Sequence, residues 1–210
     1  MADYKKPDYW QIKAREEGYP ARSVYKLKEM DEKFRLLKPH GKPSRILDLG
    51  AAPGSWSLYV LRKIHAPAGC AASFLVSSDL SPLSREFDKG LFDSEGFQFY
   101  QGDFTDPAIR DSILSHGAYS LILSDAAPAT TGSRFVDTCR SLELAEAAAS
   151  YAEDALGKGG NMVIKVFQGG DTSGLLKRLR PLFTAAKSYK PEACRSESFE
   201  VYYVGLGKIG

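Results

Sequence analysis

The stretch Arg45–Leu58, RILDLGAAPGSWSL, decides the fold of this 210-residue chain. The apolar residues of Ile46–Leu49 predict a short buried strand, which Gly50 ends. Small residues fill the following turn as far as Gly54, and Pro53 stands where a helix would begin. Such a turn lets a ligand approach the backbone, and the free N–H groups of the new helix favour polar or anionic groups. An ordinary strand-to-helix turn is the alternative.

The rest of the chain alternates between strand and helix patterns. Further strands are expected at 73–78, 97–101, 119–124, 161–167, 183–189 and 199–206. Helices are expected at 23–38, 53–65, 106–116, 137–156 and 172–180. Ser23 is the expected N-cap of the first helix, and Gly157, Gly159 and Gly160 are expected to stop the fourth. The alternation predicts an α/β fold with a mostly parallel sheet covered on both faces.

Composition indicates one globular domain spanning residues 1–210, with 43% hydrophobic and 26% charged residues. No run approaches the roughly 18 apolar residues of a membrane span, and the N-terminus lacks the apolar core of a secretory signal. A cytoplasmic location is therefore expected. Cys70, Cys139 and Cys194 form no CxxC pair, which favours a reducing compartment and structural thiols. The three scattered histidines predict no metal site.

Charge is distributed unevenly along the chain. Residues 1–42 carry a net charge of +4 and residues 157–210 one of +5, whereas residues 43–156 carry −7. Basic ends around an acidic centre suit a polyanionic partner held by the flanks. Residues 1–21 mix lysine and arginine with tyrosine and tryptophan, which suits an RNA-contacting extension. A docking helix or a poorly ordered tail is the alternative for this segment.

Acidic residues stand at the carboxyl ends of several expected strands, where parallel sheets bind their ligands. Asp79, Asp103 and Asp125 join Gly50 at these positions. Asp79 is placed to take ribose hydroxyls, as NAD-type and adenosyl-type cofactors both require. The turn lacks the G-x-G-x-x-G spacing, which disfavours a dinucleotide. Asp103 could accept a hydrogen bond from an adenine amine, with helix capping as its alternative.

Six separated stretches follow one another in a characteristic order. They are SVYKL at 23–27, DLGAAPGSWS at 48–57, QGDF at 101–104, SDAAP at 124–128, IKVFQG at 164–169 and KPEACRSESFEVYYVG at 190–205. Together they resemble the FtsJ/RrmJ family of S-adenosylmethionine-dependent RNA 2′-O-methyltransferases, over roughly residues 9–207. The resemblance implies a Rossmann-like methyltransferase fold with a mostly parallel seven-stranded sheet. It also implies S-adenosylmethionine as cofactor, no metal, and structured RNA as partner, with a monomer favoured.

The family is known for a Lys-Asp-Lys-Glu catalytic tetrad. Matching motif with motif places this tetrad on Lys26, Asp125, Lys165 and Glu200. The cofactor-binding positions implied in the same way are Asp48, Gly50, Ala51, Pro53, Gly54, Trp56, Asp79, Asp103 and Asp125. A solvated helix residue is the alternative for Lys26, and an outward strand residue is the alternative for Glu200. Lys165 inside MVIKVF would be buried at substantial cost without a partner, which Asp125 would supply.

The chemistry of the reaction explains this residue set. A ribose 2′-hydroxyl is a poor nucleophile at neutral pH and needs its proton removed as it attacks. A lysine acts as base when desolvation or a nearby cation lowers its pKa, whereas neighbouring carboxylates raise it. We expect Lys165 to be the general base, with Lys26, Asp125 and Glu200 orienting it and the ribose. Holding the hydroxyl against the sulfonium methyl would assist an in-line displacement.

The substrate implied by the resemblance is large-subunit ribosomal RNA, at a uridine of the peptidyl-transferase region. Transfer RNA, methylated in its anticodon loop, is the alternative within the same chemistry. A nucleotide-dependent oxidoreductase and a non-catalytic RNA-binding module are the alternatives from other classes. Ser55, Leu58, Ala129 and Cys194 depart from residues common in the family, and Ala129 could alter contacts with the substrate.

Overall fold

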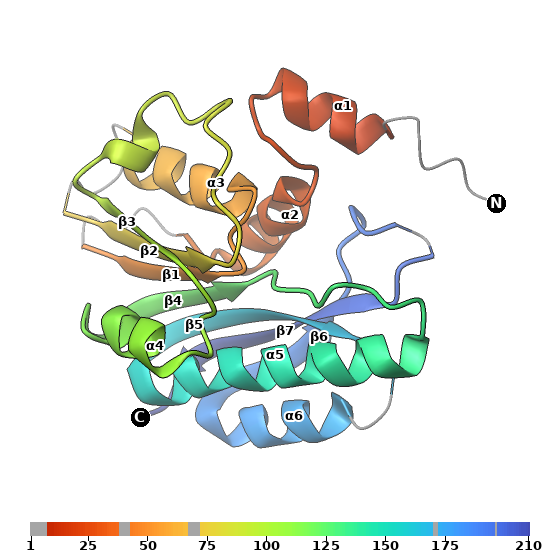
Figure 1. Cartoon of the computed structure of the whole chain (residues 1–210). Coiled ribbons are helices and arrows are strands. Elements are labelled where there is room, and N and C mark those ends of the chain that lie inside the picture. The colour runs from red at the N-terminus through yellow and green to blue at the C-terminus, as the bar shows by residue number, and fades with distance from the viewer. Residues whose placement is uncertain (1–7, 38–42, 67–71, 170–171, 196) are drawn as a thin grey trace.

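A seven-stranded sheet forms the centre of the protein (Figure 1). The computed structural model describes residues 8–37, 43–66, 72–169, 172–195 and 197–210. The strands are β1 (Arg45–Leu49), β2 (Phe74–Asp79), β3 (Phe97–Gln101), β4 (Tyr119–Ser124), β5 (Leu156–Phe167), β6 (Phe183–Tyr189) and β7 (Glu200–Lys208). Their spatial order is β3-β2-β1-β4-β5-β7-β6. The first five are parallel, and β7 is antiparallel to both β5 and β6. The expected Rossmann-like, mostly parallel seven-stranded sheet is confirmed.

Helices cover both faces of this sheet (Figure 1). One face carries α1 (Tyr9–Glu16), α2 (Val24–Phe34) and α3 (Ser55–Ile64), and the other carries α4 (Pro107–Leu114), α5 (Arg134–Ala155) and α6 (Thr172–Leu179). Short 3₁₀ turns occur at Leu91–Asp93 and Arg180–Leu182. Each face has its own buried cluster, because successive side chains of a strand point to opposite sides. No helix in the described part of the chain is long and apolar enough to cross a lipid bilayer.

Two helix starts differ from the sequence predictions. Pro53 lies before α3, in a turn where the Ala52–Pro53 peptide is cis, and Gly54 occupies the N-cap position. The expectation that Pro53 opens the helix is therefore wrong. Ser23 does stand at the N-cap of α2, but its side chain makes no capping hydrogen bond. The cause is its helical backbone, with φ −56° and ψ −22°, where a capping residue is normally extended.

Helix ends differ as well. The helix expected at 23–38 ends at Phe34, because Arg35 adopts a left-handed conformation, and Lys38 lies outside the described residues. The long helix α5 runs directly into β5 at Leu156. The three glycines expected to stop this helix lie inside β5, in a stretch where its pairing with β4 shifts register. The helix therefore ends at Ala155, close to its expected end, but β5 begins at Leu156 rather than at 161.

The glycine that ends β1 is required by close packing. Gly50 has a φ of +73°, which side-chain-bearing residues rarely adopt. A Cβ at this position would lie 2.5 Å from the Cα of Ala126, just beyond the end of β4. The ends of β1 and β4 therefore approach each other backbone to backbone, and the candidate site is built around this point.

Candidate active site

Lys165 and Asp125 form a buried ion pair at the carboxyl end of the sheet. The Nζ of Lys165 lies 3.0 Å from Oδ1 of Asp125, and the two side chains are only 7% and 15% exposed. Lys165 also donates to the backbone carbonyl of Asp125, at 2.5 Å. Tyr202, which pairs with Lys165 across β5 and β7, donates its hydroxyl to the same Oδ1 at 2.7 Å. The expected partnership of Lys165 with Asp125 is confirmed.

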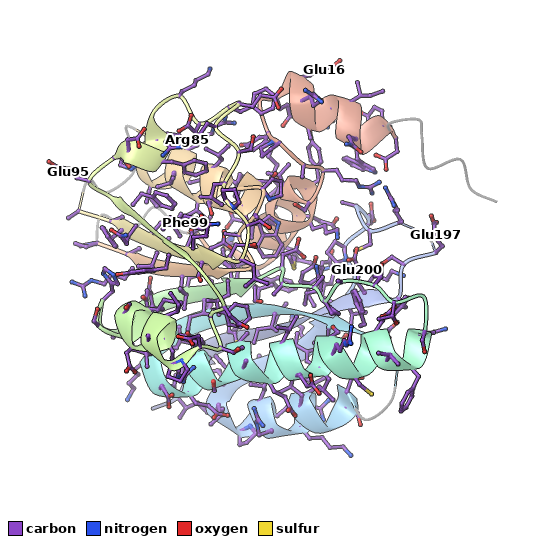
Figure 2. All side chains as sticks on the ribbon, in the orientation of Figure 1. Glu16, Arg85, Glu95, Phe99, Glu197 and Glu200 are labelled. Carbon is purple, nitrogen blue, oxygen red and sulfur yellow. The ribbon has the colours of Figure 1, made fainter. Side chains whose placement is uncertain are left out.

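Lys26 and Glu200 form a second buried pair next to the first. Lys26 in the first turn of α2 places its Nζ 2.6 Å from Oε1 of Glu200, and both side chains are about nine-tenths buried. The ring of Tyr202 lies between the pairs, with its centroid 6.0 Å from that Nζ. Figure 2 shows Glu200 inside the molecule, whereas Glu197 lies at the periphery. The alternatives of a solvated Lys26 and an outward Glu200 are therefore wrong.

The charges of these groups follow from their neighbours. Burial acts to raise the pKa of Asp125, but the ammonium groups of Lys165 and Lys26 and the hydroxyl of Tyr202 outweigh it and hold the pKa below its usual value. Burial acts to lower the pKa of Lys26, but Asp125 and Glu200 outweigh it and raise the pKa above 10.5. At neutral pH Asp125 is thus a carboxylate and Lys26 an ammonium. Burial and Asp125 raise the pKa of Tyr202 well above 10, so its hydroxyl stays a hydrogen-bond donor.

A cavity of about 370 Å³ opens beyond the strand ends, which we call the strand-end cavity. Its volume lies in the range of small-molecule binding sites. Its lining consists of Gly50, Ala52, Asp79, Leu80, Asp103, Phe104, Asp125, Ala126, Ala127, Leu144 and Lys165. Four of the expected cofactor-binding residues and both members of the Lys165–Asp125 pair are therefore brought together.

Two carboxylates of this cavity fit the adenosyl group of S-adenosylmethionine. Asp79 accepts the N–H of Ala52 at 2.9 Å on one oxygen and the N–H of Ser81 at 2.8 Å on the other. Each oxygen keeps a further lone pair for a ribose hydroxyl. Asp103 accepts both the N–H and the hydroxyl of Thr105 on Oδ1, while its Oδ2 makes no hydrogen bond to the described residues. Helix α4 is capped by Asp106 instead, so capping does not account for Asp103.

The other five expected cofactor-binding residues do not line the strand-end cavity. Ala51, Pro53 and Gly54 form the turn behind it, and Asp48 is fully buried below that turn. Trp56 is 2% exposed, and its indole N–H donates to the carbonyl of Ser23 at 2.9 Å. This hydrogen bond ties α3 to the start of α2, and the Trp56 ring also packs against the ring of Tyr202 on β7.

A second cavity of about 350 Å³, which we call the loop-side cavity, lies next to Lys26 and Glu200. It is further lined by Arg22, Ser23, Arg195, Glu197, Ser198 and Phe199. One pair of the tetrad therefore faces each cavity, and the tetrad lies between them. Asp8, the N-cap of α1, forms ion pairs with Arg22 and Arg195 at this cavity. Burial acts to raise the pKa of Asp8, but the N–H of Gln11 and the two arginines outweigh it and lower the pKa.

The N-terminal segment is in large part a docking helix. Ala14 of α1 is fully buried, and several basic residues of this region pair with acids of the protein itself. Arg15 lies 2.7 Å from Glu86, and Lys13 and Lys28 both pair with Glu17. Lys5 and Lys6, which belong to the expected RNA-contacting extension, lie outside the described residues, as do His40 and Cys70.

Two contributors to the site were missed in the sequence. Tyr202 stands two residues after Glu200, and strand alternation places both on one face, so this spacing could have revealed it. Ser55 exchanges hydrogen bonds with the backbone of Ala21 at 2.8 and 3.1 Å, which ties the start of α3 to the segment before α2.

Two sequence expectations concern thiols and metals. The exposed position of Cys139 does not fit the expected structural role for its thiol, whereas Cys194 is half-buried. Among the residues that the structure describes, no three His, Cys, Asp or Glu side chains are grouped to hold a metal ion.

Comparison with known proteins gives matches over nearly the whole chain. A family model of FtsJ-like methyltransferases matches residues 19–208. Ribosomal RNA large subunit methyltransferase E of Treponema denticola is 50% identical over 203 residues, which cover 97% of this chain and 96% of that protein. The protein of the same name from Oleidesulfovibrio alaskensis is 43% identical, covering 97% and 92%. A crystal structure described as a Plasmodium falciparum ribosomal RNA methyltransferase has a TM-score of 0.71 at 26% identity, over 91% of this chain and 100% of that one.

Proposed function

This chain belongs to the FtsJ-like methyltransferase family, and we propose that it methylates a ribose 2′-hydroxyl of large-subunit ribosomal RNA. S-adenosylmethionine is the cofactor and supplies an electrophilic methyl group on a sulfonium. The observation that carries the proposal is the position of the buried tetrad between two cavities, with Lys165 and Asp125 lining one and Lys26 and Glu200 lining the other. A methyl donor and a nucleotide can approach the tetrad from these two sides.

The strand-end cavity is the proposed donor site. Asp79 would hold the ribose hydroxyls with the lone pairs that its backbone hydrogen bonds leave over. The Oδ2 of Asp103 would accept the exocyclic amine of adenine. Leu80 and Phe104 supply apolar surface for the base. Gly50 lets the backbone at Ala126 lie directly against the turn, which brings the ends of β1 and β4 together at this cavity.

The loop-side cavity is the proposed site of the acceptor nucleotide. Lys26 and Glu200 lie at its inner wall, where they can hold ribose hydroxyls. Arg22 and Arg195 lie in the same wall and can contact flanking phosphates as forked, permanently charged donors. Asp8 would keep both guanidinium groups in place before RNA binds.

Lys165 is the proposed general base. In its neutral form the amine has two N–H groups, which match the carbonyl and Oδ1 of Asp125, and one lone pair left over. That lone pair would take the 2′-hydroxyl proton as the new O–CH₃ bond forms and the S–CH₃ bond breaks. Lys26 is unsuited to this role, because its raised pKa keeps it protonated. Its positive charge would instead stabilise the developing oxyanion.

The choice of ribosomal over transfer RNA rests on the relatives. Both quoted curated relatives are named as ribosomal RNA large subunit methyltransferases and match nearly the whole chain. A uridine of the peptidyl-transferase region is the target that family resemblance implies. We further propose that the protein acts in the cytoplasm, as a single-domain monomer.

A labelled-methyl assay tests this function directly. The protein is incubated with S-adenosylmethionine carrying a labelled methyl group and with separate pools of large ribosomal subunits, naked ribosomal RNA and transfer RNA. We expect label in the ribosomal pools, at a ribose that becomes resistant to alkaline cleavage. Lys165→Ala should abolish transfer, and Lys158→Ala, an exposed lysine on the same strand, should leave it unchanged. Label confined to transfer RNA, or near-normal turnover of Lys165→Ala, would contradict the proposal.

A further inference from the structure

Asp48 is a buried acid that the proposed mechanism does not use. It lies in β1, between β2 and β4, and its side chain is 0% exposed. Its Oδ2 accepts the hydroxyl of Ser57 at 2.7 Å, and that hydroxyl lies 3.0 Å from the hydroxyl of Ser77. Its Oδ1 has no hydrogen-bond partner in the described part of the chain. An ionised carboxylate with an unpaired buried oxygen is costly, so this position favours a proton.

The charged groups that act on Asp48 are themselves acids. Asp79 from β2 and Asp125 beyond β4 both line the strand-end cavity, and both disfavour a negative charge on Asp48. Helix α3, packed above it, contributes only the hydroxyl of Ser57. Asp125 is balanced by Lys165, and Asp79 by two backbone N–H groups. Burial, with a further contribution from these two carboxylates, raises the pKa of Asp48 to about 7, so near neutrality it is protonated about half of the time.

The donor and its product differ in charge. S-adenosylmethionine carries a positive sulfonium, which becomes a neutral thioether once the methyl has left. We propose that Asp48 releases its proton when S-adenosylmethionine binds, and that its carboxylate then favours the cationic donor over neutral S-adenosylhomocysteine. After transfer the sulfonium charge is gone, so Asp48 takes a proton back from solvent and the product is held less tightly. The inference rests on the proposed function, since it assumes that the donor occupies the strand-end cavity.

Titration calorimetry of the full chain tests this exchange by counting protons. Binding heats are measured for S-adenosylmethionine and S-adenosylhomocysteine in two buffers with different ionisation heats, at pH values from 5.5 to 8. The sulfonium makes the α-ammonium group of the donor more acidic than that of the product, so the titration of each free ligand is measured separately and subtracted from its proton count. Near pH 6.5 to 7 we expect the donor to release about half a proton more than the product. Preference for the donor should rise roughly tenfold from pH 5.5 to 8, as a pKa shift of about one unit implies.

Two variants make the assignment specific. Asp48→Asn should bring the two proton counts together and remove the pH dependence of the preference. Ser57→Ala removes a hydrogen bond that lowers the pKa of Asp48, so the pH of greatest proton release should move upward. Equal proton counts for both ligands in the wild type, or an unchanged difference in Asp48→Asn, would overturn the inference. Failure of both ligands to bind would instead contradict the proposed function on which it rests.

Discussion

The Lys165–Asp125 pair allows a quantitative test on the folded protein. Replacing Lys165 by Met keeps an unbranched chain in the core of β5 but leaves the carboxylate of Asp125, 15% exposed, without its main partner. Breaking one side of a buried ion pair costs about 3–5 kcal/mol, whereas replacing both partners by uncharged groups is often close to neutral. We therefore expect Lys165→Met to lose about 4 kcal/mol of unfolding free energy, and Lys165→Met combined with Asp125→Asn to lose much less.

Urea unfolding at pH 7.5 measures this difference. Trp56 is buried against Tyr202 and provides a fluorescence signal close to the pair. A loss of about 4 kcal/mol should move the urea midpoint by roughly 1–2 M. The double-mutant cycle should give an interaction energy of about 2 kcal/mol or more. The half-exposed pair Arg110–Asp154 serves as the matched control and should give less than about 1 kcal/mol.

The pH dependence of stability provides a second check on the same variants. The lowered pKa of Asp125 means that its contribution to stability is present above the unfolded-state pKa and lost as pH falls through the lower folded-state value. In Lys165→Met the isolated carboxylate should prefer its protonated form, so this variant should gain stability relative to wild type as pH falls from 7 to 4. Additive losses in the cycle, or a constant difference between the variants across pH, would refute this account of the pair.

Three further changes give distinct outcomes. Asp48→Asn should raise the unfolding free energy relative to wild type by about 4 kcal/mol above pH 7 and leave it unchanged below about pH 4. The reason is that the folded-state pKa of about 7 makes ionisation of Asp48 costly as pH rises between these limits. Urea midpoints measured across this pH range check the prediction, and a difference that does not change with pH would contradict it. Gly50→Ala should lower the unfolding free energy by about 3 kcal/mol and weaken donor binding, because the new Cβ would meet the backbone of Ala126 and the position has a positive φ. Thermal unfolding measures the first effect and calorimetry the second. A wild-type melting temperature would contradict the prediction. Tyr202→Phe removes the hydrogen bond from the Tyr202 hydroxyl to Asp125 and should lower the unfolding free energy by about 1–2 kcal/mol. The pKa of Asp125 should rise, so that acid unfolding begins at a higher pH. An unchanged acid transition would show that this hydrogen bond contributes little.

The regular elements were largely predictable because their signals are local. Most of the strands are short runs rich in apolar residues, and apart from the early start of β5 they begin and end within about two residues of the expected positions. The predictions were wrong where another part of the fold decides the outcome. Gly157, Gly159 and Gly160 do follow the end of the helix, but β5 already begins at Leu156 and includes them in the irregular stretch between Leu156 and Asn161, the residues that pair with β4. Pro53 is typical of a helix start, but here it lies in the turn that follows Gly50. The backbone of that turn packs closely against Ala126, and the helix begins only at Ser55.

The strand-end acids were predictable from a rule of topology. Parallel strands end at one edge of the sheet, so residues that follow different strands gather there, as Asp79, Asp103 and Asp125 do. Lys26 and Glu200 carry no such signal, because a lysine in an amphipathic helix and a glutamate at the start of a strand are usually solvated. Their assignment came from family motifs alone, and the structure supplies the physical reason: each is the buried partner of the other.

The sequence by itself determined the order of strands and helices, the glycine turn at Gly50 and the acids that surround a nucleoside-sized cavity. Only the tertiary structure decided which charges meet and which protons are held. Lys26 is kept protonated by Asp125 and Glu200, and Asp48 is driven toward its neutral form by burial below the turn. A pKa depends on desolvation and on charges within a few ångströms. Those neighbours come from distant parts of the chain, so the ionisation of the site is a property of the folded protein.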